Sequence, residues 1–141
     1  MLTFIQSDPS DGGVNTFIST SDIVPLLLEW ATEALTKSDY MFTRTSVSDP
    51  DDSFAGPVFA SGKDGYLQIR WDTYRPKIID ARGTRAPEVI NILQRVLDRC
   101  KLTTYSARTG ETPLIPNTTA PHGRTPLPDN SPREVFRTWL L

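Results

Sequence analysis

Proline is unevenly distributed along these 141 residues, and its densest stretch limits what the chain can fold into. Five of the twelve prolines, together with two glycines, lie between Arg108 and Asn130. Proline lacks a backbone N–H and fixes φ near about −65°, so this density is incompatible with a regular helix or a central strand. We therefore expect residues 108–141 to form an extended arm with a short terminal helix, separate from a domain over residues 1–107.

The end of this arm has the pattern of a helix start. Ser131 would be the N-cap, Pro132 the first helical residue and Glu134 the third residue of a capping box. A helix this short is unstable alone in water, so it must dock on another surface. Its own domain is the favoured site. A second copy of the chain, giving a homodimer through the arm, or a partner protein is the alternative. The apolar residues expected to make this contact are Val135, Phe136, Trp139 and Leu140.

Residues 1–107 carry the periodicities of both helices and strands. Apolar residues recur every three or four positions over residues 22–37 and 84–100, which predicts two amphipathic helices. The segments 57–60 and 66–72 flank a glycine-containing loop, and the second alternates apolar and polar residues, as in a half-buried hairpin strand. The predicted fold class is α+β, with a small, mostly antiparallel sheet of about four to six strands packed against two helices. Further strands are expected within 2–6, 14–19, 40–47, 77–81 and 101–107.

Residues suited to catalysis or metal binding are scarce. The chain has one histidine, His122, and one cysteine, Cys100, so no internal disulfide, thiolate cluster or multi-histidine metal site can form from it. His122 is expected in a solvated loop of the arm, and Cys100 on the buried face of the second helix. No glycine-rich phosphate-binding motif is present. These absences predict a protein that is not an enzyme and needs neither a cofactor nor a metal.

Charge divides the chain into an acidic and a basic part. Residues 1–60 contain two basic and nine acidic side chains, whereas residues 61–141 contain thirteen and eight. Clustered acidic loops complement a basic partner and speed its capture. The sequence therefore predicts a non-catalytic protein-binding module, such as an immunity protein or an inhibitor of a basic, nucleic-acid-handling protein. The acidic loop residues expected to bind this partner are Asp39, Asp49, Asp51 and Asp52.

Two other functions remain open at this point. Basic residues interleaved with aromatic ones suit single-stranded nucleic acid, although the pI of about 5.3 argues against a dedicated nucleic-acid binder. The third possibility is a structural component of a phage or secretion assembly. The residues that would contact nucleic acid are Arg70, Arg75, Lys77, Arg82 and Arg85.

The sequence gives little sign of a membrane or of export. Residues 1–6 lack the basic and apolar regions of a signal peptide. The longest apolar run, residues 23–28, contains Pro25 and is far shorter than the roughly 20 residues that span a bilayer. A cytoplasmic location and no membrane contact are therefore expected.

Overall fold

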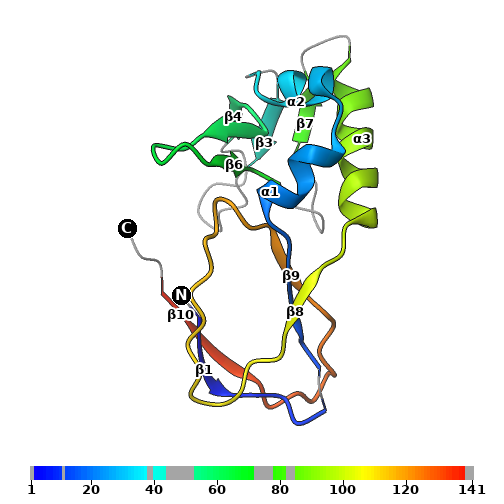
Figure 1. Ribbon diagram of the computed structural model, residues 1–141. Coiled ribbons are helices and arrows are strands. Elements are labelled where there is room, and N and C mark those ends of the chain that lie inside the picture. The colour runs from blue at the N-terminus through cyan, green and yellow to red at the C-terminus, as the bar shows by residue number, and fades with distance from the viewer. Residues whose placement is uncertain are drawn as a thin grey trace. The chain divides into compact units, whose positions relative to one another are not determined.

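The structure, a computed structural model, describes residues 2–10, 12–37, 40–43, 53–71, 78–81 and 85–138 (Figure 1). The chain forms two compact units. Unit 1 combines residues 1–18 with residues 101–141, and unit 2 comprises residues 19–100. This division does not follow the predicted boundary at residue 107, because the first strands of the chain pack with its last 41 residues.

Unit 2 begins with a helix that is interrupted twice. Helix α1 (Thr20–Ile23) leads directly into a 3₁₀ turn, η1 (Val24–Leu26), and α2 (Glu29–Leu35) begins only after extended backbone at Leu27 and Leu28. Pro25 has no N–H to continue the α-helical ladder, which explains why the single predicted helix is divided. The apolar stripe survives the interruption, since its members at intervals of four are buried: Ile23, Leu27, Ala31 and Leu35.

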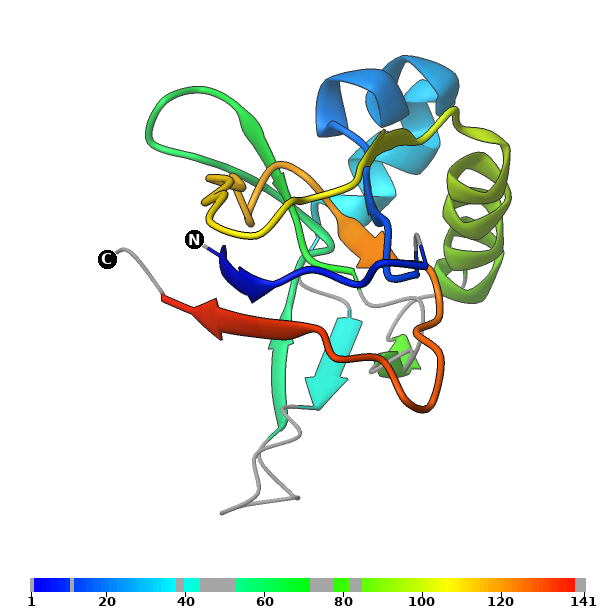
Figure 2. The ribbon, with the colours of Figure 1, turned by 90° about the horizontal axis from the view of Figure 1, so that it is seen from below.

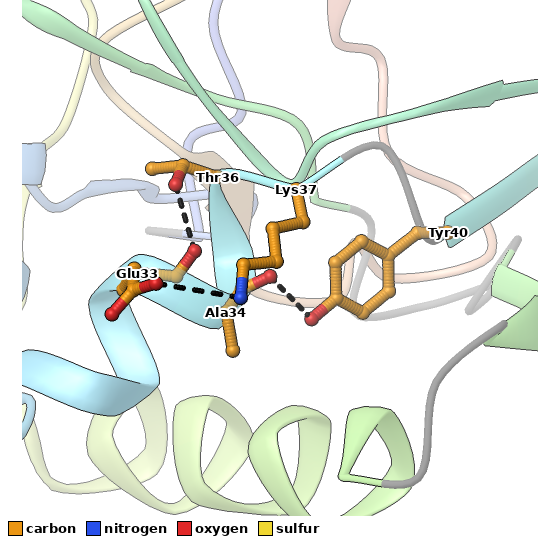
Figure 3. A network of polar contacts seen from close by, with 5 residues as sticks. All are labelled: Glu33, Ala34, Thr36, Lys37 and Tyr40. Atoms are coloured by element: carbon orange, nitrogen blue, oxygen red, sulfur yellow. Dashed lines mark hydrogen bonds and ion pairs between the residues drawn. The ribbon is translucent and has the colours of Figure 1, made fainter.

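The end of α2 is fixed by polar contacts that Figure 3 shows from close by. The hydroxyl of Tyr40, whose residue is 1% exposed, donates to the carbonyl of Ala34 at 3.0 Å. The hydroxyl of Thr36 donates to the carbonyl of Glu33 at 2.7 Å, and the Lys37 ammonium lies 3.4 Å from the Glu33 carboxylate. The carbonyls of Glu33 and Ala34 in the last turn thus accept side-chain donors as well as backbone N–H groups.

The second predicted helix is confirmed as α3 (Ala86–Arg99), which packs against α2. Val89 and Leu93 are fully buried, so the predicted apolar stripe faces the core. Cys100 follows at the C-cap and is half-buried. Burial, and secondarily the negative charge of Asp22, raises the pKa of the Cys100 thiol.

The strands of unit 2 form two small sheets. Strand β3 (Tyr40–Thr43) pairs with β4 (Ser53–Gly56) on one side and with β7 (Ile78–Ala81) on the other. The predicted hairpin is confirmed by the antiparallel pair β5 (Phe59–Ser61) and β6 (Leu67–Ile69). Gly65 occupies its turn at φ 81°, a conformation that glycine adopts without strain. The predicted alternation holds, since Ile69 is buried and Arg70 exposed.

Unit 1 is built from strands at both ends of the sequence. Strand β2 (Asn15–Phe17) lies between β8 (Thr103–Tyr105) and β9 (His122–Arg124), both antiparallel to it. Strand β1 (Leu2–Gln6) runs antiparallel beside β10 (Glu134–Arg137), as Figures 1 and 2 show. The proline-rich segment is tied to these strands rather than extended into solvent. Its backbone accepts hydrogen bonds from Leu2, Phe4, Gly13 and Ile18.

The structure differs from the predictions in two further respects. Residues 134–137 form β10 where a terminal helix was expected, because the N-terminal strand offers a backbone ladder that an isolated helix cannot match. The described strands form four small sheets instead of one sheet of four to six strands, and the α+β class stays a prediction. None of the helices in the described ranges has the length and apolar character needed to cross a bilayer.

Candidate functional site

Unit 1 contains a pocket of about 330 Å³ assembled from three distant parts of the sequence. The first comprises the buried middle of β1 and the turn that follows this strand, represented by Phe4 and Asp8. The other two are the segment after β8, which includes Arg108, and the residue just before β10, Arg133. Because two arginines and one aspartate contribute to the wall, the pocket suits a ligand with negative charge.

Arg133 is the residue that the fold holds most firmly in this wall. Its Nη1 donates to the carbonyl of Gly13, and its Nη2 donates to Oδ1 of Asn15 at 3.3 Å. The guanidinium also lies over the ring of Phe4, 4.9 Å from the centroid. Burial, reinforced by the nearby charge of Arg124, lowers the pKa of Arg133 below its ordinary value, while Asp8 opposes this effect.

One of the three guanidinium nitrogens of Arg133 makes no hydrogen bond within the described part of the chain. This nitrogen is Nε, and it is buried. A buried donor without a partner costs about 1–3 kcal/mol, so native proteins rarely leave one unless a ligand or water completes it. Guanidinium groups bind carboxylates through parallel N–H donors. The unpaired Nε therefore marks Arg133 as the candidate anion-binding residue.

The turn after β1 positions the other side of the pocket. Asp8 accepts hydrogen bonds from the backbone N–H and the hydroxyl of Ser10, and contacts with Ser10 and then Ser131 hold the pKa of Asp8 below its ordinary value. Gly13 has φ 67° and so belongs to the left-handed region. A Cβ there would lie 2.5 Å from Cδ2 of Leu127. Glycine is thus required where the Arg133 guanidinium approaches the backbone.

A second polar cluster fixes the segment that carries Arg108. The Tyr105 hydroxyl donates to Oε2 of Glu111 at 2.6 Å, and the backbone N–H of Arg108 donates to the same oxygen at 2.7 Å. The Arg108 N–H and then the Tyr105 hydroxyl lower the pKa of Glu111, and the Glu111 carboxylate raises the pKa of Tyr105. Glu111 is therefore the ionised acceptor that closes this loop beside the pocket.

His122 begins strand β9, one edge of the sheet around β2. Its side chain is exposed, its Nδ1 lies 3.3 Å from the carbonyl of Ala120, and its ring lies 6.4 Å from that of Phe17. The predicted solvated loop is therefore a solvated edge strand. Within the described ranges, no group of three or more His, Cys, Asp and Glu side chains could hold a metal ion.

Of the residues predicted to bind a partner or nucleic acid, the structure describes Arg70 and Arg85, and neither lines this pocket. Arg70 is exposed and lies over the rings of Phe42 and Phe54, 5.2 and 4.8 Å from their centroids. Arg85 lies 3.9 Å from the Trp30 ring centroid and 3.3 Å from Glu88. The acidic residues Asp39, Asp49, Asp51 and Asp52 and the basic residues Arg75, Lys77 and Arg82 lie outside the described residues.

Of the predicted oligomer contacts, the structure describes two. Val135 is half-buried and Phe136 is exposed, on opposite faces of β10. Trp139 and Leu140 lie outside the described residues. The role of these four residues stays a prediction.

Sequence reasoning missed Arg133 and its pocket entirely. Arg133 was taken as a polar residue in the first turn of a helix. The signal that competes with that interpretation is the content of strand-forming residues just after it, Val135, Phe136 and Thr138. No sequence pattern links Arg133 to Asp8 and Gly13, because more than a hundred residues separate Arg133 from that turn.

Comparison with known proteins gives a structural likeness only. No protein-family model matches the sequence, and no curated protein matches it. Among solved structures, asparagine oxygenase in complex with Fe(II), 2S,3S-3-hydroxyasparagine and succinate is 22% identical, with a TM-score of 0.76. The match covers 95% of this chain and 42% of the oxygenase.

A second set of matches is to the non-heme iron oxygenase OrfP. Its complex with Fe and alpha-ketoglutaric acid is 18% identical with a TM-score of 0.69, and its complex with Fe, succinate and (3S)-hydroxy-L-Arg is 20% identical with a TM-score of 0.67. Each match covers 95% of this chain and 41% of OrfP. At these identities the likeness shows a shared fold, and the chain spans about two fifths of the oxygenases' length.

These matches overturn the functional prediction from the sequence. A fold shared with oxygenases contradicts the prediction of a non-catalytic binding module, an immunity protein or an inhibitor. It also contradicts the prediction that the chain is not an enzyme. The prediction was wrong because the lack of a recognisable catalytic motif was interpreted as the lack of a catalytic function. A binding pocket made of single residues far apart in sequence leaves no motif to find.

Proposed function

We propose that the chain forms part of a non-heme iron oxygenase and that its pocket binds the carboxylate of a small organic acid such as alpha-ketoglutaric acid. The observation that carries the proposal is the half-buried Arg133, which lines the pocket and whose buried Nε has no partner within the described residues. Solved neighbours with this fold contain alpha-ketoglutaric acid or succinate, both dicarboxylic acids.

The chemistry of the pocket agrees with such a ligand. A volume of about 330 Å³ is sufficient for a small molecule. Arg133 stays protonated despite its lowered pKa, since guanidinium does not lose its proton in proteins. Its Nη donors are held by Gly13 and Asn15, so the guanidinium is oriented before a ligand arrives. Preorganisation of this kind reduces the entropy lost on binding.

The residues present do not fit a complete iron site. Non-heme Fe(II) oxygenases commonly hold the metal with two histidines and one carboxylate. This sequence has one histidine. It can therefore supply at most one imidazole, with His122 on β9 as the candidate, and no catalytic step through iron is assigned to these residues.

Calorimetric titration with alpha-ketoglutarate tests the proposal. The wild-type chain should bind one equivalent, and Arg133→Gln should weaken binding by roughly 10- to 100-fold, since a hydrogen bond to a charged group contributes about 1.5–3 kcal/mol. Arg133→Lys keeps the charge but loses the fixed fork, so it should also bind more weakly than the wild type.

A matched control separates pocket binding from general attraction to positive charge. Arg85→Gln removes the same charge from unit 2, where the guanidinium lies over Trp30; Arg85 is not a lining residue of the pocket. It should bind alpha-ketoglutarate like the wild type. Equal losses in the Arg85 and Arg133 variants, or no binding by the wild type, would contradict the proposal.

A further inference from the structure

The aspartate in the pocket wall also has an atom without a partner. Oδ1 of Asp8 accepts the backbone N–H of Ser10 at 2.7 Å and also the Ser10 hydroxyl. Oδ2 of Asp8 is buried and has no hydrogen-bond partner within the residues that the structure describes. Ser131 helps to lower the pKa of Asp8 by its proximity, but its hydroxyl makes no hydrogen bond to Oδ2. Asp8 therefore presents an ionised acceptor in the pocket that it lines.

Two buried atoms of opposite type thus lack partners, among the described residues, in the wall of one pocket. Nε of Arg133 is a donor, and Oδ2 of Asp8 is an acceptor. The charge of Asp8 acts on Arg133, so the two side chains lie near one another, but these two atoms are not bonded to each other. Native proteins rarely leave a buried polar atom without a partner. The two atoms together indicate a ligand that contacts both.

A ligand that contacts both atoms needs two kinds of group. A carboxylate satisfies Nε of Arg133, but an ionised carboxylate has no proton to donate to Oδ2 of Asp8. A ketone has the same limitation, whereas an ammonium or hydroxyl group supplies the missing donor. A metal cation is disfavoured at Oδ2, because Arg108 and Arg133 place positive charge in the same wall.

We infer that Asp8 determines the specificity of the pocket by selecting carboxylic acids that have an ammonium or hydroxyl group on the carbon beside the carboxylate. The inference rests on the carboxylate pocket proposed above and adds a second contact to it. Arg133 binds the carboxylate through Nε, and Oδ2 of Asp8 accepts from the donor on the neighbouring carbon. Alpha-ketoglutarate has a ketone at that carbon, so it binds Arg133 but leaves Asp8 without a partner.

Calorimetric titration with four five-carbon dicarboxylic acids tests the inference. Glutarate, alpha-ketoglutarate, 2-hydroxyglutarate and glutamate share both carboxylates and differ only at carbon 2. The wild-type chain should bind 2-hydroxyglutarate and glutamate at least about tenfold more tightly than alpha-ketoglutarate, since a hydrogen bond to a charged group corresponds to a factor of roughly 10 to 100. 2-Hydroxyglutarate has the same charge as alpha-ketoglutarate, so its advantage cannot come from net charge.

Asp8→Asn tests whether Asp8 is the source of this preference. The amide oxygen can keep the contacts with Ser10, and the NH₂ group then replaces the acceptor Oδ2 with a donor. The preference for 2-hydroxyglutarate over alpha-ketoglutarate should disappear, and the preference for glutamate should disappear with it. Loss of a negative charge alters the affinity for every anion, so ratios of affinities are compared. Glutarate has no group at carbon 2 and should still bind, which shows that the Arg133 contact is intact.

Asp64→Asn is the matched control. Oδ1 of Asp64 accepts the backbone N–H of Tyr66, two residues further on, at 3.2 Å, as Asp8 does from Ser10. Asp64 is exposed, belongs to unit 2 and is not a lining residue of the pocket. Asp64→Asn removes the same charge and should keep the wild-type ratios.

The possible results separate this inference from the proposed function. Equal affinities of the wild type for the four acids would overturn the inference and leave the carboxylate pocket in place. The inference also fails if Asp8→Asn binds glutarate and keeps the full preference, or if Asp64→Asn loses it. If Asp8→Asn no longer binds glutarate, the wild-type ratios decide. A wild type that binds none of the four acids would contradict the proposed function and the inference together.

Discussion

Gly13 offers a quantitative test of how the pocket is built. Its φ of 67° is unfavourable for any residue with a Cβ, at a cost of about 1–2 kcal/mol. In Gly13→Ala the new methyl group would also lie 2.5 Å from Cδ2 of Leu127 and against the Arg133 guanidinium. Overpacking of this kind costs typically about 1–3 kcal/mol. The two effects together predict a loss of roughly 2–5 kcal/mol in the free energy of unfolding.

Gly110 provides the matched control. It belongs to the same unit and has φ 86°, but an added Cβ would have no heavy atom within 4 Å. Gly110→Ala should therefore lose only the conformational part, about 1–2 kcal/mol. The difference between the two variants isolates the steric contribution at Gly13.

Urea denaturation followed by circular dichroism measures both free energies, and calorimetry with alpha-ketoglutarate measures the pocket. Gly13→Ala should be the less stable variant and should bind more weakly, because the Gly13 carbonyl that orients Arg133 is displaced. Gly110→Ala should bind like the wild type. Equal destabilisation of the two variants, with unchanged affinity in Gly13→Ala, would refute the packing described for this turn.

Three further predictions concern other parts of the chain. Tyr40→Phe removes the hydrogen bond to Ala34 and should reduce the free energy of unfolding by about 0.5–1.5 kcal/mol in urea denaturation; an unchanged value would mean that the bond contributes nothing. Because the pKa of Cys100 is raised, native protein should react with a disulfide reagent at pH 8 more slowly than urea-unfolded protein, and a faster native reaction would contradict its burial. The lowered pKa of Glu111 contributes stability that is present above the ordinary value of 4.5 and is lost as pH falls through the folded value, so Glu111→Gln should lose less stability on acidification than the wild type. The pKa of Asp8 is also lowered, so a smaller pH dependence should remain in this variant. Identical acid profiles of the variant and the wild type would contradict the Glu111 contacts.

The sequence predicted the elements whose signal is local. Helix α3 and the β5–β6 hairpin were anticipated because an apolar stripe at Val89 and Leu93 and the turn at Gly65 need no distant partner. The prediction of a terminal helix was wrong because residues 131–134 have the capping pattern of a helix start, although residues 134–137 form β10. The choice between helix and strand was decided by pairing with β1, more than 130 residues away.

The candidate site could not be predicted for the same reason. Arg133 acquires its role from Gly13, Asn15 and Phe4, which reach it only after β1 and β2 are in place. Periodicity and motif spacing depend on neighbours along the chain. They therefore cannot distinguish an arginine held by distant contacts, such as Arg133, from a solvated one.

Nuclear magnetic resonance of the arginine Nε–H groups gives the most direct test of the carboxylate pocket. Alpha-ketoglutarate is added to the ¹⁵N-labelled protein, and Arg133→Lys identifies the Arg133 resonance. The account predicts a saturable shift of the Arg133 Nε–H signal, because this buried donor lacks a partner among the described residues until a carboxylate binds, with little change at Arg85. A saturable shift at other arginines with Arg133 unchanged, or no shift at all, would contradict it.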